Sequence, residues 1–161
     1  MATQNNIIDQ VFPETLKILS DLIKFQTVSG TSNLMATHFQ EFADHIMRDY
    51  LQDAEDPFVV EIGSNDGSMM ENFAKENIRH LGVEPSANVA EEARRYGVNT
   101  LCSFFNLTTA EKIASEHGLA DALIAANVMC HIPDLHGVAR ATNLLLKPMG
   151  VLVFEEPYLG D

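Results

Sequence analysis

Cysteines and long apolar runs are scarce in this 161-residue sequence. The two cysteines, Cys102 and Cys130, have no CxxC partner, which excludes a disulfide framework and a zinc ribbon. Residues 1–6 are polar and lack the basic and apolar regions of a signal peptide. No apolar run approaches the roughly 20 residues that a membrane-spanning helix needs. We therefore expect a protein of the reducing cytoplasm, with no membrane partner.

Basic residues are also few. Ten Lys and Arg stand against 23 Asp and Glu, which gives a formal net charge of −13, and Arg94-Arg95 is the one basic pair. Binding to a nucleic-acid backbone needs clustered Lys and Arg, so no nucleic acid is expected as a partner. Acidic surfaces commonly serve solubility, and they are also compatible with a cationic cofactor. The length and the 46% of hydrophobic residues are typical of one globular core.

Two amphipathic helices are predicted in the first third of the chain. Apolar residues recur at helical spacing over residues 9–24, and a second apolar stripe runs from Phe39 to Tyr50. The stretch between them has loop composition, with Ser32 as a candidate N-cap. We expect an N-terminal helical segment over residues 1–56 and a second unit over residues 57–161.

Short apolar runs alternate with helical segments through the second unit. Helices of this length between strands predict a parallel sheet with right-handed crossovers. Sequences that fit capping boxes, Ser68 to Glu71 and Thr108 to Glu111, predict the starts of two of these helices. The five expected strands are residues 58–62, 79–83, 99–102, 122–126 and 151–154.

A glycine turn follows the first strand, in the sequence Glu61-Ile62-Gly63-Ser64-Asn65-Asp66-Gly67. Glu84 ends the second strand and follows Gly63 by 21 residues (84 − 63), the spacing at which an acid binds a ribose diol. A dinucleotide fingerprint would have Gly where Asn65 and Ser68 stand, and no P-loop Gly-Lys-Ser/Thr follows. S-adenosylmethionine carries a ribose and a cationic sulfonium but no phosphate, so an acid-lined turn suits it. Plain turn glycines and a solvated strand-end acid are the alternatives.

Other candidates follow the later strands, because ligands of open α/β sheets bind beyond the carboxyl ends of the strands. Phe104 and Phe105 offer a flat apolar face for an adenine, or they pack in the core. His131 is a candidate general base, or a hydrogen-bonded structural residue. Cys130, His131 and His136 have poor spacing for metal ligands, so no metal site is expected.

These motifs together resemble the class I S-adenosylmethionine-dependent methyltransferases, and in particular the C-methyltransferases of nucleotide-linked deoxysugars. The likeness covers about residues 25–161. The resemblance implies that Gly63, Asn65 and Gly67 contact the amino-acid end of the cofactor, Glu84 the ribose, and Phe104 or Phe105 the adenine. It also places Glu61, Pro85 and Asn127 in the cofactor-binding set. The blocks that carry it are EIGSNDG from Glu61, LGVEP from Leu81, Phe104-Phe105, NVMCHIPDL from Asn127, and EPYL from Glu156.

The resemblance implies a three-layer, Rossmann-like, doubly wound α/β fold with strand order 3-2-1-4-5, truncated after the fifth strand. The implied activity is C-methylation of a nucleotide-linked keto-sugar or a similar small molecule. The alternatives are a non-catalytic S-adenosylmethionine-binding module and an NAD-binding oxidoreductase domain. The family's cysteine-rich zinc domain has no counterpart here, and Phe25 and Thr27 stand where the family tends to carry tyrosines.

Seven residues follow Phe154 (161 − 154), too few for another helix and strand. We therefore expect this chain alone to be a poor catalyst, and the strand at residues 151–154 to have an open apolar edge. An open edge favours association, so we expect a homodimer through this edge and the helix face at residues 138–146.

Overall fold

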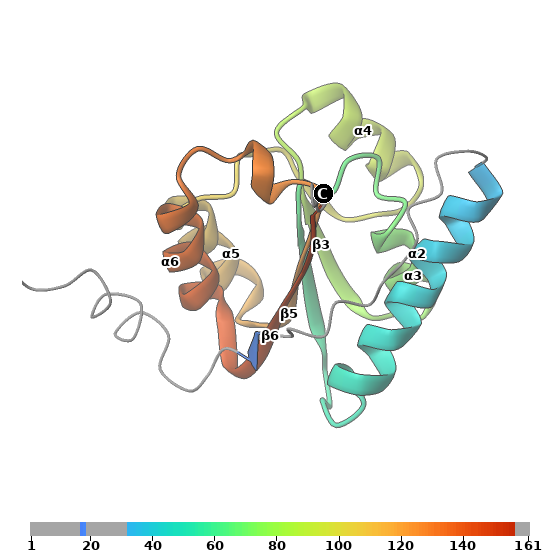
Figure 1. The fold of residues 1–161 in the computed structure, drawn as a ribbon, viewed down its shortest axis with the longest axis horizontal. Coiled ribbons are helices and arrows are strands. Elements are labelled where there is room, and N and C mark those ends of the chain that lie inside the picture. The colour runs from blue at the N-terminus through green and yellow to red at the C-terminus, as the bar shows by residue number, and fades with distance from the viewer. Residues whose placement is uncertain (1–16, 19–31, 157–161) are drawn as a thin grey trace, which may run out of the picture.

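The computed structural model describes residues 17–18 and 32–156. A parallel β-sheet lies between two layers of helices (Figure 1). Its strand order is β1-β6-β5-β2-β3-β4. The strands are β1 (Lys17–Ile18), β2 (Phe58–Ile62), β3 (Arg79–Val83), β4 (Thr100–Leu101), β5 (Ala120–Ala126) and β6 (Leu146–Glu155). The helices are α2 (Ser32–Ile46), which continues as a π-helix (Met47–Leu51), α3 (Met70–Lys75), α4 (Ala87–Arg95), α5 (Leu107–His117), a 3-10 turn (Met129–His131) and α6 (Leu135–Leu145).

Five of these strands confirm the predicted order. In chain order β2, β3, β4, β5 and β6 are the five expected strands, and their arrangement in the sheet is 3-2-1-4-5. β2 lies in the middle, with Val60 opposite Leu81 of β3 on one side and Leu123 of β5 on the other. Every residue of β2 is buried, as expected for a central strand that helices cover on both faces.

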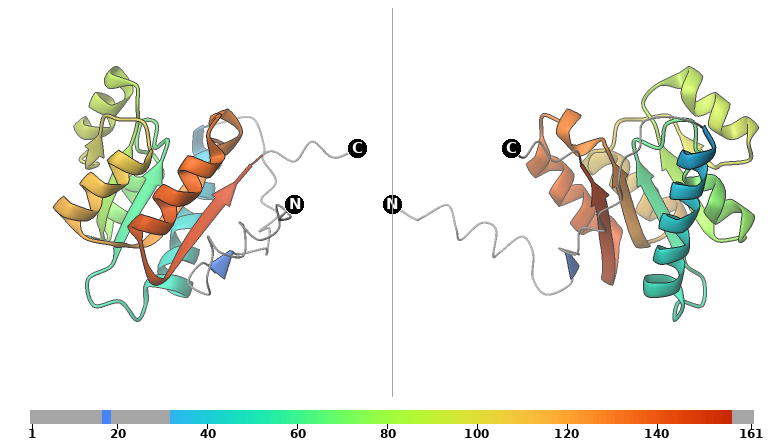
Figure 2. Two further views of the ribbon diagram at one scale, coloured as in Figure 1. Left: turned by 90° about the vertical axis from the view of Figure 1, so that its left-hand side faces the viewer. Right: turned by 45° about the vertical axis from the view of Figure 1, so that its right-hand side comes forward.

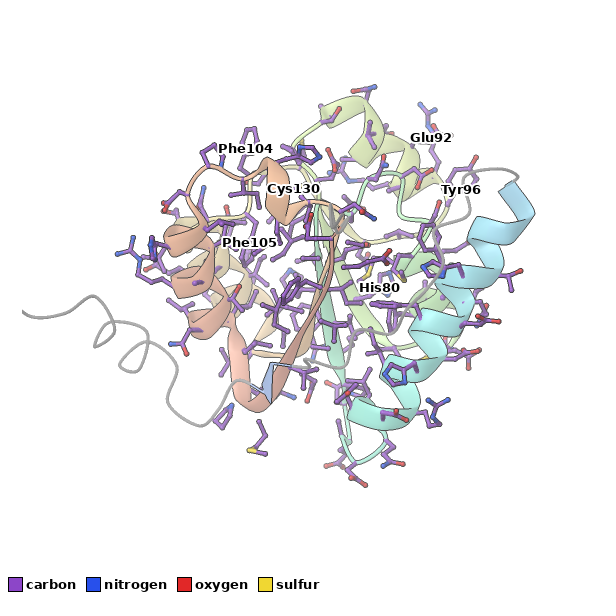
Figure 3. All side chains as sticks on the ribbon, in the orientation of Figure 1. His80, Glu92, Tyr96, Phe104, Phe105 and Cys130 are labelled. Atoms are coloured by element: carbon purple, nitrogen blue, oxygen red, sulfur yellow. The ribbon has the colours of Figure 1, made fainter. Side chains whose placement is uncertain are left out.

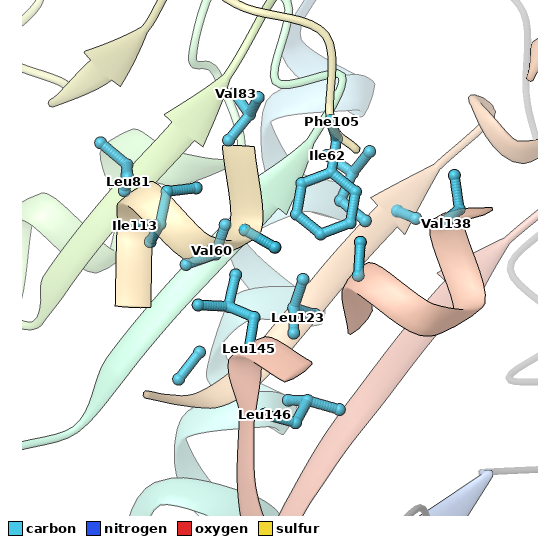
Figure 4. Close-up of a cluster of buried hydrophobic side chains, with 14 of the residues drawn as sticks. Val60, Ile62, Leu81, Val83, Phe105, Ile113, Leu123, Val138, Leu145 and Leu146 are labelled. Atoms are coloured by element: carbon cyan, nitrogen blue, oxygen red, sulfur yellow. The ribbon is translucent and has the colours of Figure 1, made fainter. Parts of the chain in front are cut away.

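Alternation along the strands divides the core into two hydrophobic clusters. Val60 and Leu123 face α5 and α6, where Phe105, Ile113 and Leu145 complete one cluster (Figure 4). Val59 and Ile124 point to the opposite face and pack with side chains of α2 and α3, among them Phe42, Ile46 and Phe73. Burying each of these large side chains contributes about 1.5–3 kcal/mol to stability. The helix at residues 32–46 is thus bound to the sheet through its own apolar stripe.

The predicted first helix, residues 9–24, is wrong at the two of its residues that the structure describes. Lys17 and Ile18 form β1, which pairs in parallel with Val151 and Leu152 of β6 (Figure 2). The remainder of that prediction lies outside the described residues. An amphipathic pattern does not reveal a pairing with a strand more than a hundred residues away, so β1 could not be predicted from it.

The structure also corrects the expected association surface. The helix face at residues 138–146 is not free, because Val138, Ala141 and Leu145 are buried against the sheet of their own chain. At the sheet edge, β1 covers Val151 and Leu152 of β6. Among the described residues, no helix is both long enough and apolar enough to span a membrane.

Candidate functional site

A pocket of about 540 Å³ opens at the carboxyl ends of β2, β3 and β5. β3 and β5 flank β2, and the helices that precede them, α3 and α5, pack on opposite faces of the sheet. Open α/β sheets bind ligands at such a switch point. Phe39 of α2 and Met69, directly before α3, contribute to its walls. The other lining residues are Glu61, Gly63, Ser64, Asn65, Asp66, Ser68, Glu84, Pro85, Ala126, Asn127 and Val128.

The glycine turn forms one wall of the pocket. The backbone N–H of Gly63 donates to the carbonyl of Val83 at 2.8 Å, which ties the turn to the end of β3. Gly63 has φ +69°, and a Cβ there would lie 2.6 Å from Cγ2 of Val128. Only glycine combines this φ with such a close approach of the loop after β5. Asn65 also has a positive φ of 50°, which asparagine tolerates better than most residues.

Glu84 lies beside this turn with its carboxylate fixed by two backbone groups. Oε2 accepts from the N–H of Asn65 at 3.1 Å, and Oε1 accepts from the N–H of Ser86 at 2.8 Å. Each carboxylate oxygen can accept more than one hydrogen bond, so both keep capacity for a ligand hydroxyl. The side chain is therefore buried, oriented and still able to accept.

Glu61, at the end of β2, is a buried acid with an unsatisfied oxygen. The residue is 4% exposed, and its Oε2 has no hydrogen-bond partner in the described part of the chain. Burial, reinforced by the nearby charges of Asp66 and Glu84, raises the pKa of Glu61 to about 8. An unpaired buried carboxyl is costly, and a cationic ligand would relieve the cost.

The pocket is acidic throughout. Glu61, Asp66 and Glu84 line it, and none of the described lining residues is Lys or Arg. Asp66 is itself held in place, since its Oδ1 accepts from the N–H of Ser68 at 3.1 Å and from the hydroxyl of Ser68 at 2.6 Å. Such walls suit a cation or a neutral diol and disfavour a phosphate.

The loop after β5 forms the opposite wall. Asn127 has φ +53°, and its N–H donates to the carbonyl of Glu155 at 2.7 Å. The 3-10 turn follows, with Cys130 and His131 exposed. Oε1 of Glu156 accepts from the backbone N–H groups of Val128 and Met129. The Glu156 carboxylate, through a hydrogen bond, also raises the pKa of the Cys130 thiol.

The structure brings together six of the predicted site residues and separates the others. Phe105 is buried in the core beside Ile62 and Val138 (Figure 4), which is the packing alternative. Phe104, in the loop between β4 and α5, is 73% exposed (Figure 3). Neither phenylalanine lines the pocket, and neither do Gly67 and His131. The six that do are Glu61, Gly63, Asn65, Glu84, Pro85 and Asn127.

Seven of the 13 lining residues (13 − 6) were not among the predicted site residues, and Glu156 beside the pocket was not among them either. Phe39 belonged to a helical stripe that predicted core packing, and nothing local indicated that it reaches a strand end. Glu156 lies in a motif that carried the resemblance, but its bonds to Val128 and Met129 connect residues about 27 positions apart. An acid directly after a buried strand was the one signal that could have identified it.

Comparisons with known proteins agree with this geometry. Residues 35–161 match the family described as a methyltransferase domain. The C-methyltransferase NovU of Streptomyces niveus is 35% identical over 138 residues, which are 85% of this chain and 32% of NovU. The chain therefore spans about a third of that relative's length.

Two solved structures share the fold. DesVI of Streptomyces venezuelae aligns with a TM-score of 0.60 and 17% identity, over 76% of this chain and 51% of DesVI. The magnesium protoporphyrin IX methyltransferase ChlM of Synechocystis PCC 6803, with bound SAM, aligns with a TM-score of 0.50 and 16% identity, over 91% of this chain and 67% of ChlM. The family match and the sheet order together show that this chain belongs to the methyltransferase domain family, with the Rossmann-like sheet of the class I S-adenosylmethionine-dependent methyltransferases.

Proposed function

We propose that the pocket binds S-adenosylmethionine and that the domain serves methyl transfer to carbon. The observation that carries this proposal is the unpaired Oε2 of Glu61, buried in a pocket whose charged lining residues are all acids. A ligand with a cation and a diol, and without phosphate, matches these hydrogen-bond acceptors. NAD, with its pyrophosphate, would meet three acidic side chains and no described basic side chain.

Each part of the pocket has a counterpart in this ligand. Glu61 would pair with the ammonium of the amino-acid end, which would approach over the bare backbone at Gly63. Glu84 would accept from the two ribose hydroxyls while its other hydrogen bonds hold it in place. Pro85 and Asn127 would bound the nucleoside. Phe105 is buried in the core and Phe104 lies outside the pocket, so Phe39, which lines it, is the aromatic side chain that would lie against the adenine.

When bound, S-adenosylmethionine supplies the methyl group of its sulfonium as the electrophile. The contribution of the chain is to orient this group and hold the acceptor beside it. We infer an acceptor carbon next to a carbonyl, as in a nucleotide-linked keto-sugar, and the likeness to a C-methyltransferase at 35% identity supports this class. His131, three residues beyond the pocket-lining Val128, would take the proton from that carbon.

One observation favours a second candidate, a non-catalytic S-adenosylmethionine-binding module. Among the described residues that line the pocket there is no His, Lys, Tyr or Cys, and the proposal assigns Glu61 and Glu84 to the cofactor, which leaves Asp66 as the one lining acid without a role there. Methyl transfer to a keto-sugar nucleotide, lost in His131→Ala, would support the enzyme. Cofactor binding with no transfer to any carbon acid would support the module.

Titration calorimetry with S-adenosylhomocysteine, beside NAD, tests the cofactor. We expect binding of S-adenosylhomocysteine with one site per chain and no heat from NAD. Binding of NAD without S-adenosylhomocysteine would overturn the proposal and favour the oxidoreductase alternative.

A further inference from the structure

The Glu156 side chain connects the end of β6 to the loop that follows β5. Its Oε1 accepts from the N–H of Val128 at 3.0 Å and also from the N–H of Met129. These two N–H groups lie at the start of the 3-10 turn, whose own bonds run from the N–H of His131 to the carbonyl of Val128 and from the N–H of Ile132 to the carbonyl of Met129. One carboxylate oxygen of Glu156, a residue that is not part of the turn, therefore satisfies the two N–H groups at the start of the turn.

The position of this turn determines the shape of the pocket. Val128 and Asn127 line the pocket, and Gly63 approaches Val128 so closely that an added Cβ would lie 2.6 Å from its Cγ2. The loop consequently has little room to shift without closing the pocket or leaving a gap. Asn127 has positive φ, which asparagine tolerates, and its N–H donates to the carbonyl of Glu155 at 2.7 Å, so the loop is also tied to β6 through its backbone.

Ordinary strand-end packing does not require a carboxylate here. Oε2 of Glu156 is buried and has no hydrogen-bond partner among the described residues, which costs free energy that an apolar side chain would not. The neighbouring Glu155 has no such arrangement, since its carboxylate faces His38 at 3.6 Å. The charged acceptor is thus placed where it binds two backbone donors of the loop, although it leaves one oxygen unsatisfied.

We propose that Glu156 is a positioning residue of the site: by capping the turn at residues 129–131 it holds Asn127 and Val128 against the cofactor pocket and fixes where His131 stands. The inference rests on the proposed function, because it assigns the pocket to S-adenosylmethionine. Glu156 acts through the loop and contacts no ligand.

The test compares Glu156→Ala and Glu156→Gln with Glu155→Ala, which removes the same charge one residue earlier. Amide hydrogen exchange by NMR follows the N–H groups of Val128 and Met129, with Val60 and Leu123 of the sheet as internal references. Calorimetry with S-adenosylhomocysteine, far below the melting temperature, gives the affinity of the folded protein.

We expect Glu156→Ala to lose protection at Val128 and Met129 alone and to bind S-adenosylhomocysteine about tenfold more weakly. Glu156→Gln should restore most of the amide protection and most of the affinity for S-adenosylhomocysteine, because its amide oxygen can accept the same two hydrogen bonds. Glu155→Ala should leave both unchanged. A general loss of stability would instead expose Val60 and Leu123 as well, and glutamine would not rescue it selectively.

Unchanged affinity for S-adenosylhomocysteine in Glu156→Ala would overturn the inference. So would an equal loss of affinity in Glu155→Ala, or a Glu156→Gln variant that binds as weakly as Glu156→Ala. If Glu156→Ala does not fold, Glu156→Asp replaces it, since its shorter side chain keeps the charge and withdraws the oxygen from both N–H groups. If the unaltered chain binds no S-adenosylhomocysteine, the proposed function fails, whereas the exchange data still decide whether Glu156 caps the turn.

Discussion

The backbone N–H of Asn65 donates to Oε2 of Glu84 at 3.1 Å, so the glycine turn after β2 and the acid after β3 form one unit. The other oxygen of Glu84 holds the N–H of Ser86 at the start of α4. A residue expected to serve only the ribose therefore also maintains the conformation of Asn65, which has positive φ. Binding and local stability should be coupled at Glu84.

Glu84→Ala tests that coupling. The variant loses a charge-assisted acceptor for the ribose, so we expect S-adenosylhomocysteine affinity to fall by about 1.5–3 kcal/mol, tenfold or more. Two backbone N–H groups also lose their acceptor, and we expect the free energy of unfolding to fall by about 1–2 kcal/mol. Calorimetry and urea unfolding measure the two effects, with Glu111→Ala, an exposed acid of α5, as control. Undiminished affinity would remove Glu84 from the site.

Glu61 should make stability depend on pH. Its pKa is about 8 in the folded chain against an ordinary 4.5, so between these values the folded state holds a proton that the unfolded state has released. The contribution of Glu61 to the free energy of unfolding is therefore fully present below about pH 4.5 and is lost as the pH rises through 8. The loss is up to about 1.4 kcal/mol per pH unit. Glutamine does not titrate, so Glu61→Gln lacks this dependence on pH. Its free energy of unfolding relative to the unaltered chain, measured by urea unfolding, should rise from pH 5.5 to pH 8.5. A difference between the two proteins that stays constant with pH would contradict the assignment.

The same group should release a proton when a cationic ligand binds. A positive charge beside Glu61 favours its ionised form, so S-adenosylhomocysteine affinity should increase with pH up to about 8. Calorimetry at pH 6.5 in two buffers of different ionisation enthalpy should show release of close to one proton per site. In Glu61→Gln the release should vanish. Equal proton release in both proteins would show that another group is responsible.

Comparing Gly63→Ala with Gly97→Ala separates the effect of the close contact with Val128 from the effect of backbone strain. Gly63 and Gly97 both have positive φ, but a Cβ at Gly97 meets nothing within 4 Å whereas one at Gly63 would press on Val128. Gly97→Ala should therefore cost only about 1–2 kcal/mol of backbone strain. Gly63→Ala should cost about 1–3 kcal/mol more and weaken ligand binding. Adding Val128→Ala should relieve the extra loss in Gly63→Ala, as thermal unfolding would show, and failure to do so would exclude the contact with Val128.

The fold could be predicted because its signals are local and repeated. The apolar runs at β2 and β5 alternate with helical segments, and the strand-end rule then brings Glu61, Glu84 and Asn127 to one pocket. β1 could not be predicted, since two residues carry no periodicity. Phe39 was missed because the pocket lies far from it in sequence. The strand-end rule does select residues 155–158, but the bonds of Glu156 to Val128 and Met129 could not be predicted from positions so far apart.

The two predicted capping boxes were wrong because other hydrogen-bond acceptors lie close to each helix start. The Thr108 capping box was wrong: α5 begins at Leu107, and Oδ1 of Asn106 accepts from the N–H of Thr109 at 3.0 Å. The Ser68 box was also wrong, because that serine donates to Asp66 and α3 begins at Met70 without a side-chain cap. In both cases a neighbouring Asn or Asp supplied a better-placed acceptor.

The exposed end of β6 gives the last prediction. β1 pairs with Val151 and Leu152 only, and no described strand pairs with Val153 or Phe154 on that side. Phe154 is 48% exposed, so an apolar edge remains, although shorter than the sequence predicted. Unpaired N–H and C=O groups at an open edge can pair with another strand, and a short edge limits that pairing. We therefore expect only weak self-association, which light scattering detects as a mass rising with micromolar concentration.

Phe154→Lys should keep the chain monomeric, because a charge on an edge strand opposes pairing. Val153→Lys is unsuitable for this purpose, since Val153 is buried with Ile124 and the lysine would disrupt the core. Tyr96→Lys, which places the same charge on an exposed aromatic position just after α4, is the control and should leave association intact. A chain that stays monomeric at every concentration would refute self-association, and a dimer that persists in Phe154→Lys would show that another surface forms it.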